Sequence, residues 1–315
     1  MALDKLARQA MKSGRDQADA VIEARHKALK RRARVQRERG VSPAAATMGM
    51  KTRRVPELLS RSASSAGLVL AEGDSWFDYP LYDVLDLLED EHGFDVESVA
   101  RAGDRVESMA YAAGQLSNFS RRLEKLLRES RVPKAILLSG GGNDVAGLEL
   151  GVLLNHAASG MPGLSENMLK GMVDERIRAA VTTIIAGISK VAQHWLQRPI
   201  PILLHGYDHP VPDGRGVLGG WGPLPGPWLK PSLDAKGHSD PAQAKALMET
   251  LIDRLNTVLM DITNVPQFQH VSFIDLRGTL STGSDYKQFW GNELHPTEKG
   301  FKLVAARFVE RLNQI

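Results

Sequence analysis

The sequence predicts an α/β protein, a three-layer α/β/α sandwich around a five-stranded parallel sheet, preceded by a basic helical N-terminal arm. Two observations carry this prediction. From Gly67 onward, short apolar runs alternate with segments of helical periodicity, which is the pattern of a parallel sheet covered by helices on both faces. Before that point the chain is strongly basic, whereas the remainder is acidic. We therefore expect two parts, an arm and linker over residues 1–65 and the main domain over residues 66–315.

The strands are expected at the apolar runs, which are residues 67–71, 94–100, 134–139, 200–205 and 271–276. Helical spacing predicts helices at 81–91, 109–129, 172–197 and 241–263, with a last helix after Pro296. In such a sheet the ligand site lies at the carboxyl ends of the strands. The residues that follow those ends should therefore surround one cleft, and they are Ser75, Gly103, Asn143, His205, Tyr207, Asp208 and Asp275.

The arm differs from the rest of the chain in charge. Residues 1–65 carry 16 Lys/Arg against 6 Asp/Glu, and residues 66–315 carry 24 against 31. Apolar residues recur at roughly helical spacing between Leu3 and Leu29, so we expect a helix there. The segments 42–47 and 60–65, rich in small residues, are expected to be linkers.

Three kinds of partner are open for the arm. A solvated helix that packs on its own domain, or on a second copy of the chain in a homo-oligomer, is the ordinary outcome for a run of charges. An anionic lipid or polymer surface would attract the same charges. Nucleic acid is disfavoured, because the basic run from Arg25 to Arg39 has no interleaved aromatic residues and matches no docking motif.

Composition excludes several kinds of chemistry. With 315 residues, 43% of them apolar, the chain can bury a sizeable core. It has no cysteine, which excludes disulfides, thiolate metal sites and cysteine nucleophiles. It has no run of about 18 uninterrupted apolar residues, and charges interrupt the N-terminus where a signal peptide would be apolar. We expect a cytoplasmic protein without a transmembrane segment.

A candidate nucleophile follows the first predicted strand. Ser75 lies in Gly73-Asp74-Ser75-Trp76, directly after the apolar run that ends the strand, on a turn that glycine permits. Serine is a weak nucleophile at neutral pH and needs a base and oxyanion donors. Three later blocks offer both, and they are Ala102-Gly103-Asp104, Gly140-Gly141-Gly142-Asn143-Asp144 and Asn292-Glu293-Leu294-His295-Pro296-Thr297.

In this order and spacing the four blocks resemble the SGNH (GDSL-type) hydrolase superfamily, in its bacterial-type esterase/lipase branch. The resemblance extends from about Gly67 to the end of the chain. It implies a flavodoxin-like fold, with Ser75 as the nucleophile and His295 as the general base. It also implies an oxyanion hole formed by the N–H groups of Ser75 and Gly103 and the side-chain amide of Asn143.

The chain departs from the family pattern at one position. Members of the family usually carry an aspartate three residues before the histidine, and here that position is Asn292. An amide can accept a hydrogen bond from the imidazole but carries no charge, so it stabilises imidazolium less. Three explanations are open. Another carboxylate orients His295, and the candidates are Asp275, Glu293 and Asp208. Alternatively, a main-chain carbonyl orients it, or the site is slow or non-hydrolytic.

Aromatic residues surround the predicted nucleophile and base, and they either line the substrate cleft or hold loops onto the sheet. They are Trp76, Phe77, Tyr79, Phe289 and Trp290. The long segment 207–237, with two tryptophans among prolines and glycines, is expected to form a lid or the wall of an acyl pocket. As substrate-binding residues we expect Trp76, Tyr207, Asp208 and Trp290.

The sequence therefore predicts a serine hydrolase of carboxylic esters that acts through an acyl-enzyme at Ser75, on a small-molecule or lipid ester. No cofactor is expected. Metal binding is disfavoured, because His205, Asp208 and His209 share one short loop and a fourth protein ligand is not evident. The alternative is a weakly catalytic or non-catalytic protein of the same fold that binds an anionic partner through the arm.

Overall fold

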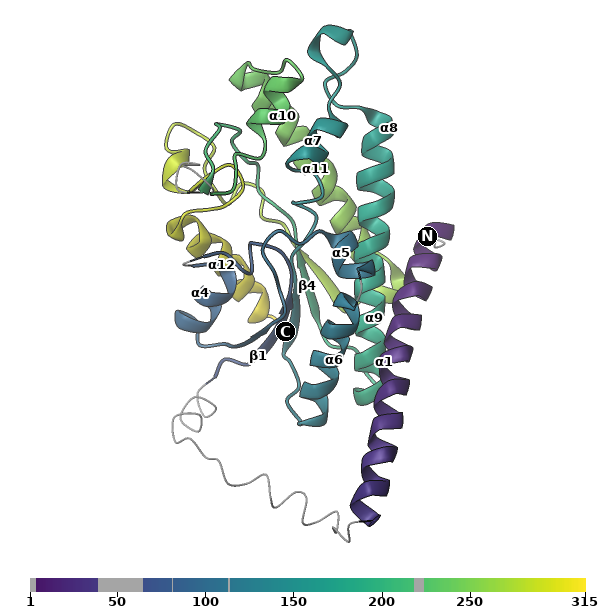
Figure 1. The fold of residues 1–315 in the computed structure, drawn as a ribbon. Helices are drawn as coiled ribbons and strands as arrows, with labels where there is room; N and C mark the ends of the chain where they lie inside the picture. The colour runs from purple at the N-terminus through teal and green to yellow at the C-terminus, as the bar shows by residue number, and fades with distance from the viewer. Residues whose placement is uncertain (1–3, 39–64, 81, 113, 218–223) are drawn as a thin grey trace.

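The computed structural model describes residues 4–38, 65–80, 82–112, 114–217 and 224–315 (Figure 1). Its centre is a five-stranded sheet in which every pair of neighbouring strands is parallel. The strands are β1 (Leu68–Glu72), β2 (Asp95–Ser98), β3 (Ala135–Leu138), β4 (Ile202–His205) and β5 (Val271–Ile274), in the order β2-β1-β3-β4-β5. This is the flavodoxin-like order, and the predicted α/β fold is confirmed.

The order of the strands locates the binding edge. The chain runs from β1 outward to β2 and then crosses back to β3 on the other side of β1. Near their carboxyl ends, β1 pairs with β2 at Ala71 and Ser98, and with β3 at Glu72 and Leu138. In open α/β sheets a ligand binds beside the strand ends where the order reverses. Here that point lies between the ends of β1 and β3.

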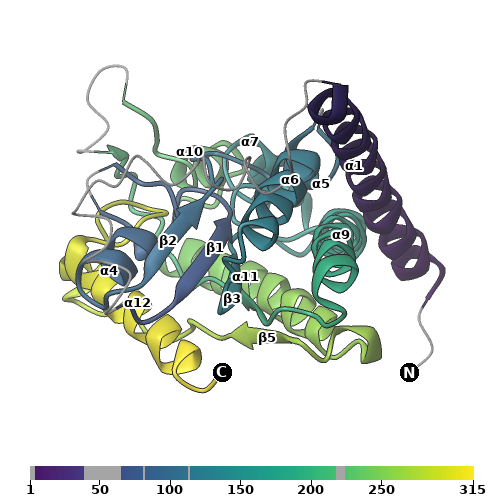
Figure 2. The ribbon, with the colours of Figure 1, turned by 90° about the horizontal axis from the view of Figure 1, so that it is seen from below.

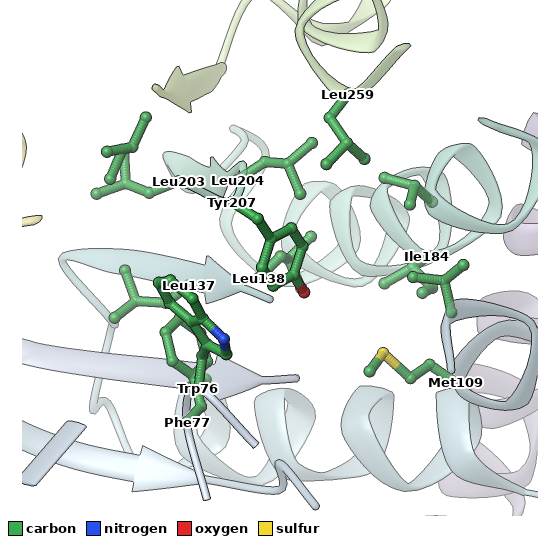
Figure 3. Close-up of a cluster of buried hydrophobic side chains, with 14 of the residues drawn as sticks. Trp76, Phe77, Met109, Leu137, Leu138, Ile184, Leu203, Leu204, Tyr207 and Leu259 are labelled. Atoms are coloured by element: carbon green, nitrogen blue, oxygen red, sulfur yellow. The ribbon is translucent and has the colours of Figure 1, made fainter. Parts of the chain in front are cut away.

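Helices cover both faces of the sheet (Figure 2). One face carries α4 (Val84–Asp90) and α12 (Glu298–Leu312), which pack on each other. The other carries α5 (Val106–Tyr111), α6 (Gln115–Arg128), α9 (Arg178–Leu196) and α11 (Pro241–Thr263). The core between the layers contains leucines of β3 and β4, and Figure 3 shows Trp76, Phe77 and Tyr207 among them.

The predicted helices need three corrections. The segment predicted as one helix over 109–129 forms α5 and α6, because Ala112 has extended backbone and Gly114 has a φ of +88°. The helix predicted at 172–197 begins with π-helical geometry over Lys170–Ile177 before α9. Three short helices were not predicted, and they are α7 (Leu148–Leu153), α8 (Glu166–Leu169) and α10 (Lys230–Ala235).

The N-terminal helix α1 (Lys5–Glu38) packs along α9 and runs parallel to it (Figure 1). Its buried stripe includes Met11 and Ala18, which belong to the hydrophobic core. At Gly14 the two helices approach so closely that a Cβ atom would lie 2.0 Å from the Thr183 carbonyl oxygen. The predicted linker 42–47, and 60–65 apart from Ser65, lie outside the described residues. None of the helices in the described ranges is both long enough and apolar enough to cross a membrane.

Candidate active site

The turn after β1 presents Ser75 at the carboxyl edge of the sheet. Gly73 has no room for a side chain, because a Cβ atom there would lie 2.6 Å from Cβ of Ser139. The buried carboxylate of Asp74 accepts hydrogen bonds from the Trp76 N–H at 3.0 Å and from the Ser139 hydroxyl at 2.7 Å. These contacts tie the turn to the end of β3 and fix the position of Ser75.

His295 meets Ser75 from the other end of the chain. Its Nε2 lies 2.7 Å from the Ser75 Oγ, and both residues are buried. The indole N–H of Trp76 donates to the Leu294 carbonyl at 3.1 Å, which joins the two segments beside this contact. The last helix, α12, begins after Pro296 as predicted, and Thr297 caps its start by accepting from the Gly300 N–H.

Asn292 holds the other nitrogen of the imidazole. Its Oδ1 lies 3.0 Å from Nδ1 of His295 and accepts from the main-chain N–H groups of Leu294 and His295, both at 2.9 Å. Only the amide oxygen can accept from two N–H groups, so the orientation of the amide follows from these bonds. The same oxygen then requires a proton on Nδ1. Nε2 is therefore the unprotonated nitrogen, and it faces the Ser75 hydroxyl.

Burial determines the protonation of His295. The side chain is enclosed, and the cost of placing a charge there lowers the pKa of His295 to about 3. Asn292 contributes no charge that would raise it again. His295 is therefore neutral at physiological pH, as a general base must be before it accepts a proton.

The other carboxylates considered for this role are engaged elsewhere. Asp275, the first candidate, forms a two-point ion pair with Arg277 at 2.9 and 2.6 Å, whereas Nδ1 of His295 faces Asn292. Glu293 turns away and accepts from four main-chain N–H groups, those of Gly214, Trp228, Leu229 and Lys230. Asp208 accepts from the main-chain N–H groups of His209, Gly278 and Leu280.

The predicted oxyanion residues lie on loops that are bonded to one another. One amide N–H of Asn143 donates to the Asp104 carbonyl at 2.9 Å, which leaves its second N–H for a ligand. The loop of Gly103 is joined to the nucleophile turn by the bond from the Arg101 N–H to the Gly73 carbonyl. Within the described part of the chain, neither the Ser75 N–H nor the Gly103 N–H has a hydrogen-bond partner.

A small cavity opens beside Ser75 and Asn143. Its volume is about 40 Å³, and its walls are mainly apolar, including Val145, Leu229, Met248, Ile252 and Leu294. The four residues predicted to bind substrate, Trp76, Tyr207, Asp208 and Trp290, all line it. Two of them use their polar groups within the protein, because the Tyr207 hydroxyl donates to Asp74 and the Asp208 carboxylate caps main-chain N–H groups. Tyr207 and Asp208 can therefore contact a substrate by van der Waals packing, because their polar atoms already have partners within the protein.

Two aromatic side chains contact His295, and the sequence did not single them out for this. Tyr79 stacks on its ring, with the centroids 4.3 Å apart. Trp228 packs against it edge to face at 5.5 Å, held in place by Glu293. Trp228 lies in the segment predicted as a lid or pocket wall, and its neighbour Leu229 does line the cavity. Residues 218–223, which include the other tryptophan of that segment, lie outside the described residues.

The three potential metal ligands His205, Asp208 and His209 have different partners in the structure. His205 is buried beneath Trp76, and its Nδ1 lies 2.6 Å from the Gly206 carbonyl oxygen. His209 pairs with Asp253 at 3.0 Å. Over the residues that the structure describes, no group of three or more His, Asp or Glu side chains is arranged to hold a metal ion.

Comparison with known protein families identifies one family for this chain. The model of the GDSL-like lipase/acylhydrolase family matches residues 46–308. Among solved structures, the lipase Lip_vut3 from a goat rumen metagenome shares 14% identity, with 77% of this chain and 96% of that chain covered and a TM-score of 0.46. A catalytic mutant of the acetylxylan esterase Axe2 from Geobacillus stearothermophilus shares 15% identity, with 79% and 95% covered and a TM-score of 0.39. No curated protein matches the chain. At these TM-scores the likeness is limited, and the fold assignment rests on the strand order of the chain itself.

Proposed function

The chain belongs to the GDSL-like lipase/acylhydrolase family and is an ester hydrolase, and from this premise we propose that it cleaves carboxylic esters through an acyl-enzyme formed on Ser75. The observation that carries the proposal is the 2.7 Å contact between the Ser75 Oγ and Nε2 of a neutral, buried His295. Nucleophilic catalysis needs a nucleophile and a base within hydrogen-bond reach of each other, and a third group that orients the base.

In the first half of the reaction His295 takes the proton of the Ser75 hydroxyl on Nε2. The Ser75 Oγ forms a bond to the ester carbonyl carbon, and the electron pair of the carbonyl double bond moves to its oxygen. The free N–H of Asn143 and the N–H groups of Ser75 and Gly103 are the donors for this oxyanion. When the carbonyl re-forms, the bond to the leaving alkoxide breaks, and the alkoxide takes the proton from Nε2.

In the second half water replaces the alcohol. His295 accepts a proton from the water, whose oxygen attacks the acyl carbon, and the same donors stabilise the second oxyanion. Collapse breaks the bond to the Ser75 Oγ and releases the carboxylic acid, and Nε2 returns the proton to Ser75. Asn292 keeps Nδ1 protonated throughout, so that Nε2 alone exchanges protons.

The cavity beside Ser75 limits the acyl group. The cavity measures about 40 Å³ and is bounded by side chains, so a short acyl group fits it better than a long one. Its apolar walls favour a hydrocarbon chain over a charged one. We therefore propose short acyl groups, with acetyl to butyryl as the range, as the best substrates.

The test is a series of p-nitrophenyl esters from acetate to decanoate, compared by kcat/KM, with the Ser75→Ala protein as the blank. The proposal predicts the highest value between two and four acyl carbons. Met248→Ala should shift the optimum to longer chains, since Met248 forms part of the wall. A wild-type optimum at eight or more carbons would contradict the short-acyl proposal. No hydrolysis of any ester would favour the non-catalytic alternative.

A further inference from the structure

Tyr79 is placed against the face of the general base. Its ring and the imidazole of His295 are stacked, with 4.3 Å between centroids and 23° between planes. The main-chain N–H of Tyr79 donates to the Asp83 carboxylate at 3.1 Å, and Asp83 in turn caps the first turn of α4. Tyr79 therefore belongs to a turn between Ser75 and helix α4, and the contact with Asp83 fixes the position of this turn.

The same side chain also contacts the residue behind the base. The Tyr79 hydroxyl accepts a hydrogen bond from the Asn292 Nδ2 at 3.1 Å. Asn292 is thus held at both ends, by main-chain N–H groups on its oxygen and by Tyr79 on its nitrogen. One aromatic residue touches both the base and the group that orients it.

Catalysis creates a charge that this site is poorly equipped to hold. His295 must become imidazolium while the tetrahedral intermediate exists, yet it is buried and its orienting partner is an uncharged amide. Two carboxylates adjoin the pair in sequence and have other partners: Asp74, next to Ser75, accepts from Tyr207, and Glu293, two residues before His295, accepts from main-chain N–H groups. Burial lowers the pKa of His295 to about 3, and the Asn292 amide on Nδ1 adds no opposing charge.

We propose that Tyr79 supplies part of the missing charge stabilisation, by presenting the negative face of its ring to the imidazolium of His295 while its hydroxyl holds Asn292. A cation within about 6 Å of an aromatic centroid is attracted by the ring quadrupole, and the attraction grows when water is excluded. Tyr79 is a positioning residue in this scheme, since it acts through His295. The inference rests on the proposed function, in which His295 is the base.

The first experiment weakens the ring face without changing the packing. The series is Tyr79→Phe followed by phenylalanines with one, two and three ring fluorines at position 79, incorporated into the full chain. Each fluorine makes the ring face less negative at nearly constant shape. We expect kcat to fall progressively, by about tenfold across the series, with KM changed less than about twofold. The same series at Tyr82, which packs on Phe301 instead of His295, is the matched control and should leave kcat unchanged.

The second experiment restores the charge. In the Asn292→Asp background a carboxylate faces His295, so the fluorine series at position 79 should change kcat clearly less than in the wild-type background. A purely structural role for the ring would give the same slope in both backgrounds, and that result would overturn the proposal.

The remaining outcomes separate this inference from the function it rests on. An active enzyme whose kcat does not respond to fluorination would reject the inference alone. A wild-type protein that neither hydrolyses esters nor reacts with a fluorophosphonate would reject the proposed function and the inference with it. A fall in kcat confined to the Tyr79→Phe step, with measurable activity that does not change on fluorination, would assign the effect to the hydroxyl and also overturn the role of the ring face.

Discussion

The Oγ of Ser75 and Nε2 of His295 lie 2.7 Å apart although 220 residues separate them in the chain. Ser75 follows the interior strand β1, and His295 precedes the last helix, α12, which packs against α4 on one face of the sheet. The indole of Trp76 bridges the two segments through the Leu294 carbonyl. The pairing of nucleophile and base therefore depends on the packing of the first and last parts of the α/β domain.

Asn143→Ala should lower kcat by about 100-fold or more, because the variant loses a donor that acts on the oxyanion and not on the ground-state ester. Steady-state kinetics with a short-chain p-nitrophenyl ester give the measurement. Asn155→Ala is the control, since the Asn155 amide donates to the Pro162 carbonyl outside the site and its loss should leave kcat unchanged. An effect of Asn143→Ala confined to KM would make Asn143 a substrate-binding residue instead.

The wild-type enzyme should keep its kcat/KM at a lower pH than an enzyme whose catalytic histidine has an ordinary pKa. A free imidazole loses its function as a base below about pH 6.5, whereas burial lowers the pKa of His295 to about 3. The base thus stays neutral as the pH falls through 6 and 5, and kcat/KM should remain nearly constant wherever the protein is folded. Measured together with circular dichroism at each pH, an acidic limb at 6.5 or above would contradict this account of the site.

Asn292→Asp should move the acidic limb of the same profile upward. The new carboxylate favours imidazolium, so the pKa of His295 rises and the base is protonated at a higher pH. At neutral pH the variant should retain activity or gain it. Asp275→Ala should behave like the wild type, since Asp275 pairs with Arg277 and not with His295. Equal pH profiles for wild type and Asn292→Asp would show that position 292 does not face the imidazole.

Gly14→Val should destabilise the protein by about 1–3 kcal/mol, the usual cost of forcing a side chain into a packed contact. A Cβ at Gly14 would meet the Thr183 carbonyl oxygen at 2.0 Å, so α1 must shift away from α9. Ala20→Val introduces the same β-branched residue at an exposed position of α1 and controls for the cost of valine in a helix. Urea unfolding provides the free energies. Equal stability of the two variants would mean that α1 does not dock on α9 in solution.

The fold was predictable from the sequence because every strand overlaps one of the ranges in which it was expected, and segments of helical spacing lie between these ranges. The helix over Pro241–Thr263 begins and ends where it was expected. The division of 109–129 was not foreseen, because the left-handed backbone at Gly114 is a local property that apolar spacing does not report. The docking of α1 was open because a charged helix with one apolar stripe packs equally well on its own domain or on a second copy.

The candidate site was predictable where residues follow strand ends. It was less predictable where contacts between side chains determine which residues meet. Ser75 and Asn143 extend from the neighbouring strands β1 and β3, so the sheet alone places them together. Asp275 also follows a strand, yet Arg277 two residues later forms an ion pair with it, a competition that strand ends do not reveal. The stacking of Tyr79 on His295 joins two loops distant in sequence, and no periodic pattern in either one predicts it.

The acyl-enzyme proposal depends most directly on the reactivity of Ser75. The decisive measurement is mass spectrometry of the intact protein and its peptides after reaction with a fluorophosphonate. It compares the wild type with Ser75→Ala and with a control variant, Ser139→Ala, which removes another buried hydroxyl. We predict one adduct per chain on the peptide containing Ser75, none in Ser75→Ala with its fold intact, and reduced but detectable labelling in Ser139→Ala, since Ser139 supports the turn through Asp74. An adduct on another residue, or ester hydrolysis by Ser75→Ala at the wild-type rate, would contradict the proposed mechanism.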